Sequence, residues 1–296
     1  MMYETPIETL VCDSWSMQIA PLVGGRIFSL THDGRQGRRA ILRPVPGDQP
    51  IAEAIRNAGC YPLVPFSNRI ENARFQVNGR AIALSAHPIA LPHAIHGNGW
   101  LAAWTVRDRD DHSMTLRFVH ERSDWPWPFE AQQQFALDRD GLTVSVSVTP
   151  TGAEPMPCGL GFHPYFPRPP GTRLETLVTQ HWILRPDCIP VGSEIPRGRY
   201  AFADGPVLST GLDDGYSGWN REALLHYHDH SVRLTASSGL DKLVVYAPDR
   251  FPLVCVEPVS HVTNAANLPA VLQAEAGWRS VPPGETCQAW MHIALV

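Results

Sequence analysis

The chain has 296 residues, of which 44% are hydrophobic and 18% are charged, a balance that is typical of a globular protein and not of a disordered one. The formal net charge is −5 and the sequence pI is about 6.2, so the chain has no basic excess for binding a nucleic-acid backbone. No apolar run approaches the roughly 18 residues that a membrane-spanning helix needs.

The N-terminal stretch MMYETPIETLVCDSW carries acidic residues early and lacks the basic start and apolar run of a signal peptide. The six cysteines are scattered along the chain without a CxxC pair, which predicts reduced thiols. We therefore expect a cytoplasmic protein that contacts neither membranes nor nucleic acids.

Strand patterns dominate the sequence, whereas sustained helical periodicity is hard to find. Alternating or continuous apolar runs predict strands in four segments: 113–122, 141–150, 242–248 and 251–258. Residues 74–85 form a predicted hairpin around Asn78-Gly79, and short helices are predicted at 51–59 and 268–277. The 28 prolines and 23 glycines punctuate the chain throughout, which favours a β-sandwich or barrel. The sequence thus predicts an all-β fold with a few short helices, in a single domain over residues 1–296.

Two segments in the first third of the chain concentrate polar groups. YPLVPFSNRIENARF (61–75) contains Arg69, whose planar fork of donors suits an oxygen-rich ligand, although an exposed turn explains the pattern equally well. HAIHGNGW (93–100) places His93 and His96 three residues apart, a spacing that can bind metal on a helix. The glycines that follow favour a loop instead, so we expect no metal there.

GLGFHPYF (159–166) places an ionisable histidine inside an apolar, proline-stiffened segment. Its two glycines begin like a dinucleotide-binding fingerprint, but Pro164 occupies the third glycine position and no strand–helix–strand pattern surrounds it. The local sequence leaves two interpretations of His163. It is either a hydrogen-bonded core histidine or a proton donor held in an apolar pocket.

Two further segments carry clusters of acids or histidines. LDDGYSGWN (212–220) sets Asp213 and Asp214 beside aromatic residues, an arrangement that can grip a sugar or form a plain acidic turn. HYHDH (226–230) projects three histidines to one side of an extended segment, which could hold zinc, and a solvated hairpin end is the alternative.

Glu257 ends the apolar run FPLVCVEP. A carboxylate in that position is costly to bury unless it is paired or used. Its desolvation should raise its pKa towards the value that suits a general base at neutral pH.

Taken in order, these segments resemble the aldose 1-epimerase (mutarotase) family over nearly the whole chain. The motifs that carry the resemblance are NRI (68–70), HAIHG (93–97), WPF (127–129), GFHPYF (161–166), DDGY (213–216), EP (257–258) and NAAN (264–267). The resemblance implies a large antiparallel β-sandwich of the galactose mutarotase-like type. It also implies an isomerase that needs no metal or organic cofactor.

The resemblance assigns roles to particular residues. His163 would be the general acid and Glu257 the general base, while Arg69 and His96 would bind and polarise the sugar. Asp213 is the better match to the substrate-binding aspartate because it lies three residues before an aromatic residue, and Asp214 is the close alternative. Such an acid and base can open a cyclic hemiacetal and reclose it as the other anomer.

Three other functions remain in competition. A sugar-phosphate 1-epimerase of the same superfamily would need a cluster of cations at the pocket edge, for which Arg26, Arg43 and Arg74 are candidates. A carbohydrate-binding protein on the same scaffold would need neither acid nor base. A zinc hydrolase built on HYHDH would require a metal.

Overall fold

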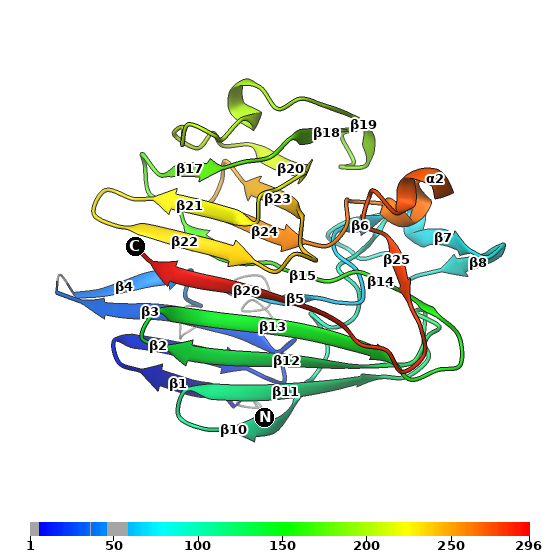
Figure 1. The fold of residues 1–296 in the computed structure, drawn as a ribbon, viewed down its shortest axis with the longest axis horizontal. Helices are drawn as coiled ribbons and strands as arrows, with labels where there is room; N and C mark the ends of the chain where they lie inside the picture. Colours follow the sequence, from blue (N-terminus) through cyan, green and yellow to red (C-terminus); the bar gives the residue numbers. More distant parts are fainter. Residues whose placement is uncertain (1–5, 36, 46–58) are drawn as a thin grey trace.

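The computed structural model describes residues 6–35, 37–45 and 59–296. The first strands of the described residues form a four-stranded antiparallel sheet (Figure 1). Its strands are β1 (Glu8–Cys12), β2 (Trp15–Ala20), β3 (Arg26–Gly34) and β4 (Gly37–Leu42).

Among the described residues, two eight-stranded antiparallel sheets form the body of the fold. The first runs, in spatial order, through β10 (Thr105–Arg109), β11 (Ser113–His120), β12 (Phe129–Asp138), β13 (Gly141–Pro150), β26 (Cys287–Leu295), β22 (Ser231–Ala236), β21 (Glu222–His226) and β17 (Arg173–Thr176). The second runs through β19 (Pro190–Glu194), β18 (Gln180–Leu184), β20 (Leu212–Ser217), β23 (Lys242–Ala247), β24 (Leu253–Val259), β15 (Gly161–Phe162) and β5 (Pro62–Leu63), with β16 (Tyr165–Pro167) also pairing with β24.

Short strand pairs and helical turns complete the described chain. The pairs are β6 (Arg69–Ile70) with β9 (Ala94–Ile95), β7 (Arg74–Val77) with β8 (Arg80–Ala83), and β14 (Met156–Cys158) with β25 (Arg279–Val281). The helical turns are η1 (Glu71–Ala73), η2 (Gly198–Tyr200), η3 (Ala265–Asn267) and α2 (Ala270–Gln273). In the described ranges no helix has the length and apolarity needed to cross a membrane.

The strand predictions are confirmed. Strands β11, β13, β23 and β24 overlap the four predicted segments. Strands β7 and β8 form the predicted hairpin on either side of Asn78-Gly79. The predicted helix at 268–277 is shorter than expected: one α-helical turn follows Pro269, and its Val271 is exposed, so it has no apolar face to bury. The predicted helix at 51–59 lies almost entirely outside the described residues.

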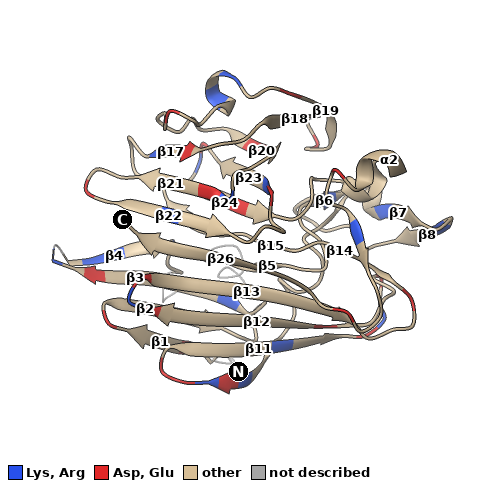
Figure 2. Ribbon diagram, in the orientation of Figure 1, with Lys and Arg blue, Asp and Glu red and all other residues tan. Residues whose placement is uncertain are grey.

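A hydrophobic cluster fills the space between the sheets. It includes Val146 of the first sheet and Val254 and Val256 of the second, all essentially inaccessible to solvent. Strands β13 and β26 carry no charged residue and are uniformly tan in Figure 2. Alternate residues of a strand face opposite sides of its sheet. Because Val254 and Val256 face the core, Cys255 and Glu257 must face the other side of the second sheet.

Candidate active site

A cavity of about 240 Å³ lies on the side of the second sheet that Glu257 faces. Its volume is below the range of about 300 to 1,000 Å³ that is typical of drug-sized ligands, and it suits a single small ring. All five residues predicted as site residues line it: Arg69, His96, His163, Asp213 and Glu257. The structure therefore brings together side chains that are up to 188 residues apart in the sequence, as Arg69 and Glu257 are.

The register of the second sheet explains how its residues reach the cavity. Asp213 of β20 lies opposite Tyr246 of β23, which in turn lies opposite Cys255 of β24. Residues that are directly opposite in an antiparallel ladder share a face. Glu257 lies two positions beyond Cys255 and so shares the same face. The carboxylates of Asp213 and Glu257 therefore project from neighbouring rows of one surface.

The same geometry separates the two candidate aspartates. Asp214 follows Asp213 in β20, so its side chain faces the opposite side of the sheet, where its Oδ1 lies 3.0 Å from His181 Nε2. Asp213 lines the cavity, and its Oδ2 lies 3.5 Å from Arg69 Nη2. Of the pair, Asp213 alone lines this cavity.

His96 is held by a local loop. Its backbone has a left-handed φ of 61°, and the following Gly97 has a φ of 67° with no room for a Cβ, which would lie 2.2 Å from the carbonyl oxygen of Val64. The backbone N–H of Asn68 donates to His96 Nδ1 over 3.1 Å. This contact leaves Nε2 to carry the proton of the neutral ring. Burial, followed by the nearby His163 and Arg69, lowers the pKa of His96 well below its usual value, so the ring is a neutral hydrogen-bond donor.

His163 is held between two tyrosine rings. The Tyr165 ring stacks on it at a centroid distance of 4.5 Å and the Tyr61 ring lies at 4.6 Å on a tilt of 33°. An arginine lies over each tyrosine in turn, with Arg26 Cζ 4.6 Å from the Tyr61 ring centroid and Arg43 Cζ 4.6 Å from that of Tyr165. The backbone N–H of His163 donates to the carbonyl of Tyr61. These contacts fix the imidazole with Nε2 facing Glu257.

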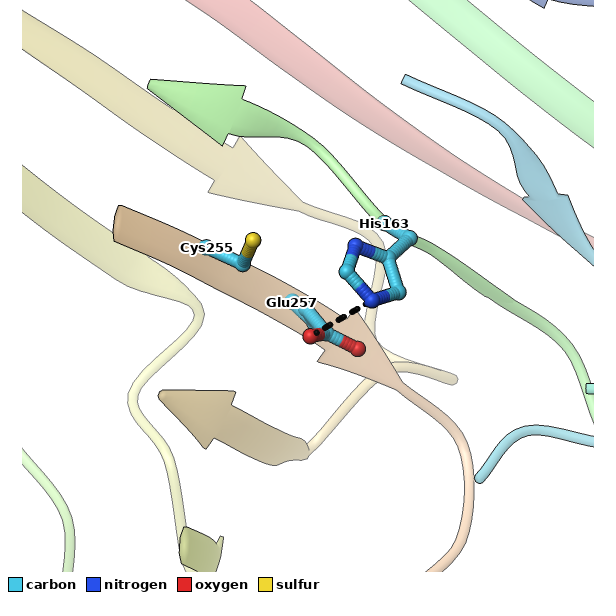
Figure 3. A group of neighbouring side chains, drawn as sticks. All are labelled: His163, Cys255 and Glu257. Carbon is cyan, nitrogen blue, oxygen red and sulfur yellow. Dashed lines mark ion pairs between the residues drawn. The ribbon is translucent and has the colours of Figure 1, made fainter. Parts of the chain in front are cut away.

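The two predicted proton-transfer groups are in direct contact. His163 Nε2 lies 3.1 Å from Glu257 Oε1 (Figure 3), and both side chains are almost completely buried. Burial raises the pKa of the Glu257 carboxyl well above its usual range, the charge of Asp213 adds to this rise, and Arg69 opposes it. Burial also lowers the pKa of His163, and the charges of Arg26 and Arg43 lower it further. Both effects favour a neutral pair that shares one mobile proton.

The other predicted clusters do not form sites of this kind. The HYHDH segment is the turn between β21 and β22, where His226 Nε2 lies 2.8 Å from Glu175 Oε2 and His230 Nδ1 lies 2.7 Å from Asp229 Oδ1. His226, His228 and His230 do not form a metal-ligating group in the described part of the chain. The aromatic residue of the DDGY motif, Tyr216, does not line the cavity, because it is packed in the core.

Sequence reasoning missed the aromatic walls of the cavity. Tyr61, Tyr165 and Tyr246 line it, together with Ile89 and Ile95. Tyr165 could have been found as the neighbour of His163 in HPYF. Tyr246 could have been found from β23, in which both faces are buried. The tryptophans Trp104 and Trp219 are buried in the core and do not line this cavity.

Comparisons with known proteins agree on one family. The sequence matches the family described as aldose 1-epimerase over residues 14–294. It is 30% identical over 251 residues to the uncharacterised Escherichia coli K12 protein YphB, covering 81% of this chain and 84% of YphB.

Solved structures agree with this result. An Escherichia coli K12 protein that is itself only a candidate aldose 1-epimerase superposes with a TM-score of 0.88 at 27% identity, covering 98% of this chain and 99% of its own. A galactose mutarotase-like protein from Clostridium acetobutylicum has a TM-score of 0.90 at 20% identity, covering 100% of this chain and 96% of its own, and shows the same fold.

Proposed function

The chain belongs to the aldose 1-epimerase family, and on that premise we propose that it interconverts the α and β anomers of a free aldose by opening and reclosing the sugar ring. The observation that carries the proposal is the contact between His163 and Glu257 in a cavity also lined by Arg69, His96 and Asp213. A protein that only bound sugar would have no need of an acid and a base buried side by side.

The proton transfers of ring opening can be assigned to this pair. With Glu257 ionised and His163 protonated, Glu257 removes the proton of the anomeric hydroxyl while His163 protonates the ring oxygen, and the C1–O5 bond breaks. The open-chain aldehyde then faces a protonated Glu257 and a neutral His163. After the C1–C2 bond rotates, His163 removes the proton from the C5 hydroxyl and Glu257 returns a proton to the aldehyde oxygen. The other anomer forms, and the pair is restored.

The 3.1 Å contact gives the pair a direct route between its two protonation states. In the free protein, burial favours the neutral state, which is the one that matches the open-chain sugar. Transfer of one proton from Glu257 to His163 generates the base and the acid that a ring-closed sugar needs. Each positioned proton transfer contributes roughly 10² to 10⁴ in rate, which is enough for a reaction that already proceeds slowly in water.

The remaining polar groups would orient the sugar. His96 presents a neutral N–H, Arg69 presents guanidinium donors, and Asp213 presents acceptors for hydroxyl groups. The tyrosine rings give the cavity apolar walls against which the faces of a pyranose can pack.

A phosphorylated sugar is less well supported. Arg26 donates to the carbonyl of Trp100 over 2.6 Å and lies behind Tyr61, and Arg43 lies behind Tyr165. Arg74 is exposed and does not line the cavity. Among the described lining residues the one arginine is Arg69, which is already near the carboxylate of Asp213.

Anomer exchange on a panel of free aldoses, followed by NMR or polarimetry, tests the proposal. We expect wild-type protein to accelerate exchange on at least one sugar, and Glu257→Gln to lose roughly 10² to 10⁴ of that acceleration. The variant Glu285→Gln, which alters an exposed carboxylate, serves as the matched control. If no free aldose responds, the same panel as 6-phosphates separates a phosphate-specific epimerase from a sugar-binding protein without turnover.

A further inference from the structure

Cys255 lies beside the pair formed by His163 and Glu257 (Figure 3). It lies two residues before Glu257 in β24, so both side chains project from the same face of the strand. The Cys255 thiol, a ring nitrogen of His163 and a carboxylate oxygen of Glu257 all lie within 4.8 Å of one another. All three residues are buried, and the proton chemistry described above makes no use of the thiol.

We propose that these three side chains form a binding site for a thiophilic divalent cation, with Zn²⁺ as its natural probe. Sulfur, imidazole nitrogen and carboxylate oxygen are the three ligand types that zinc takes in proteins, and three protein ligands leave the fourth position open to water or a sugar hydroxyl. Because His163 and Glu257 both line the cavity, the cation can enter from the sugar side.

The observed separations, of up to 4.8 Å, are longer than those of a formed tetrahedral zinc site. With zinc–ligand distances of about 2.0 to 2.3 Å, the ligand atoms should lie roughly 3.3 to 3.6 Å from one another. The three ligand atoms must therefore approach one another by roughly 1 Å to close around the ion. A thiolate ligand also sets the selectivity, because Mg²⁺ and Ca²⁺ prefer sites built from oxygen alone.

A cation in this position would bind the carboxylate of Glu257 and the imidazole of His163. It would occupy His163 and Glu257 together, so neither could exchange a proton with the sugar. The site would therefore inhibit anomer exchange. This consequence rests on the proposed function, whereas the binding of the cation does not.

Co²⁺ absorption tests the site without any sugar, because a cobalt–thiolate bond gives a charge-transfer band that histidine and carboxylate ligands alone do not give. We expect wild-type protein to show this band at one Co²⁺ per chain, and Zn²⁺ but not Mg²⁺ to abolish it. Cys255→Ser should lack the band and bind Zn²⁺ at least about 100-fold more weakly, since even outer-sphere partners of a metal site cost 10- to 100-fold.

Cys60→Ser is the matched control. Cys60 is an equally buried thiol close to the same residues but outside the ligand group, so this variant should keep the band. Cys255→Ala provides a second test should the serine variant fail to fold. A band that survives in a folded Cys255 variant, or no band in wild type, would overturn the proposal.

The two proposals fail separately. Absence of the band with anomer exchange intact refutes the metal site alone. A band without exchange on any aldose leaves the metal site standing and refutes the proposed activity. Where both are present, Zn²⁺ should inhibit wild type and Cys60→Ser at concentrations that displace Co²⁺, and inhibition of Cys255→Ser should need at least about 100-fold more Zn²⁺.

Discussion

Replacing Glu257 by glutamine should stabilise the protein while it slows anomer exchange by roughly 10² to 10⁴. Burial raises the pKa of the Glu257 carboxyl well above its usual value, so the native protein holds a proton there that the unfolded chain releases above a pKa of about 4.3. Glutamine has nearly the same shape and does not titrate. The substitution therefore removes the free-energy cost of keeping a buried carboxyl protonated, which wild-type protein bears for function.

The size of the gain depends on pH in a defined direction. Above about pH 4.3 the native state binds one more proton than the unfolded state, so wild-type stability falls by about 1.4 kcal/mol for each pH unit while the native carboxyl stays protonated. The advantage of Glu257→Gln should therefore grow by up to about 2.7 kcal/mol between pH 5 and pH 7. His163, whose pKa burial lowers, contributes the opposite slope below its unfolded pKa of about 6.5. That contribution is common to both proteins and cancels in the difference.

Urea unfolding at pH 5, 6 and 7, with a chelator present, measures this difference directly. Glu285→Gln, at an exposed position, should show no such trend. A glutamine variant that is less stable than wild type, by an amount that does not change with pH, would refute the reasoning. It would show that native wild-type protein binds no more protons than the variant does, so that the Glu257 carboxyl is ionised without a compensating proton on His163.

The remaining predictions concern the same cavity and its surroundings. Asp213→Asn should lower kcat/KM about 10- to 100-fold through the loss of hydrogen bonds to a charged acceptor, whereas Asp214→Asn should leave KM unchanged; steady-state kinetics of both variants decide this. Arg43→Met keeps apolar packing on the neighbouring tyrosine but removes one of the charges that lower the pKa of His163, so the acid limb of the kcat/KM profile should move to higher pH by a fraction of a unit. His228→Ala should leave anomer exchange unchanged, and a large loss of rate would contradict the site described here.

The strands could be predicted because each leaves a local pattern. In β13, Leu142 to Val148 alternate with serine and threonine, and the structure buries the apolar positions on one face. Strand β24 is a continuous apolar run because both of its faces are covered, one by the core and one by the cavity wall. The helix predicted at 268–277 is only one turn long in the structure, because helix propensity without a buried apolar face does not sustain a longer helix.

The site could be predicted only through the order of its motifs. No local pattern near Arg69 or Asp213 indicates that the two side chains meet, because the contact depends on the pairing of β6 with β9 and on the arrangement of the second sheet. The choice between Asp213 and Asp214 likewise depends on strand alternation relative to the core. Of the two tyrosines that flank His163, Tyr165 is its neighbour in the sequence, whereas Tyr61 comes from a distant segment that the sequence gives no sign of.

Burial of the acid and base suits the proposed reaction because the pair never changes its total charge. An isolated carboxylate or imidazolium would be costly to bury in such a site. The neutral pair and the ion pair differ only in which side of the 3.1 Å contact between His163 Nε2 and Glu257 Oε1 carries one proton. Ring opening passes one proton to Glu257 and takes one from His163, so no net charge accumulates in the apolar surroundings. Under the proposed function, burial gives the protein short, direct proton transfer, and the cost of burial falls only on its stability. That cost is what the glutamine variant should recover.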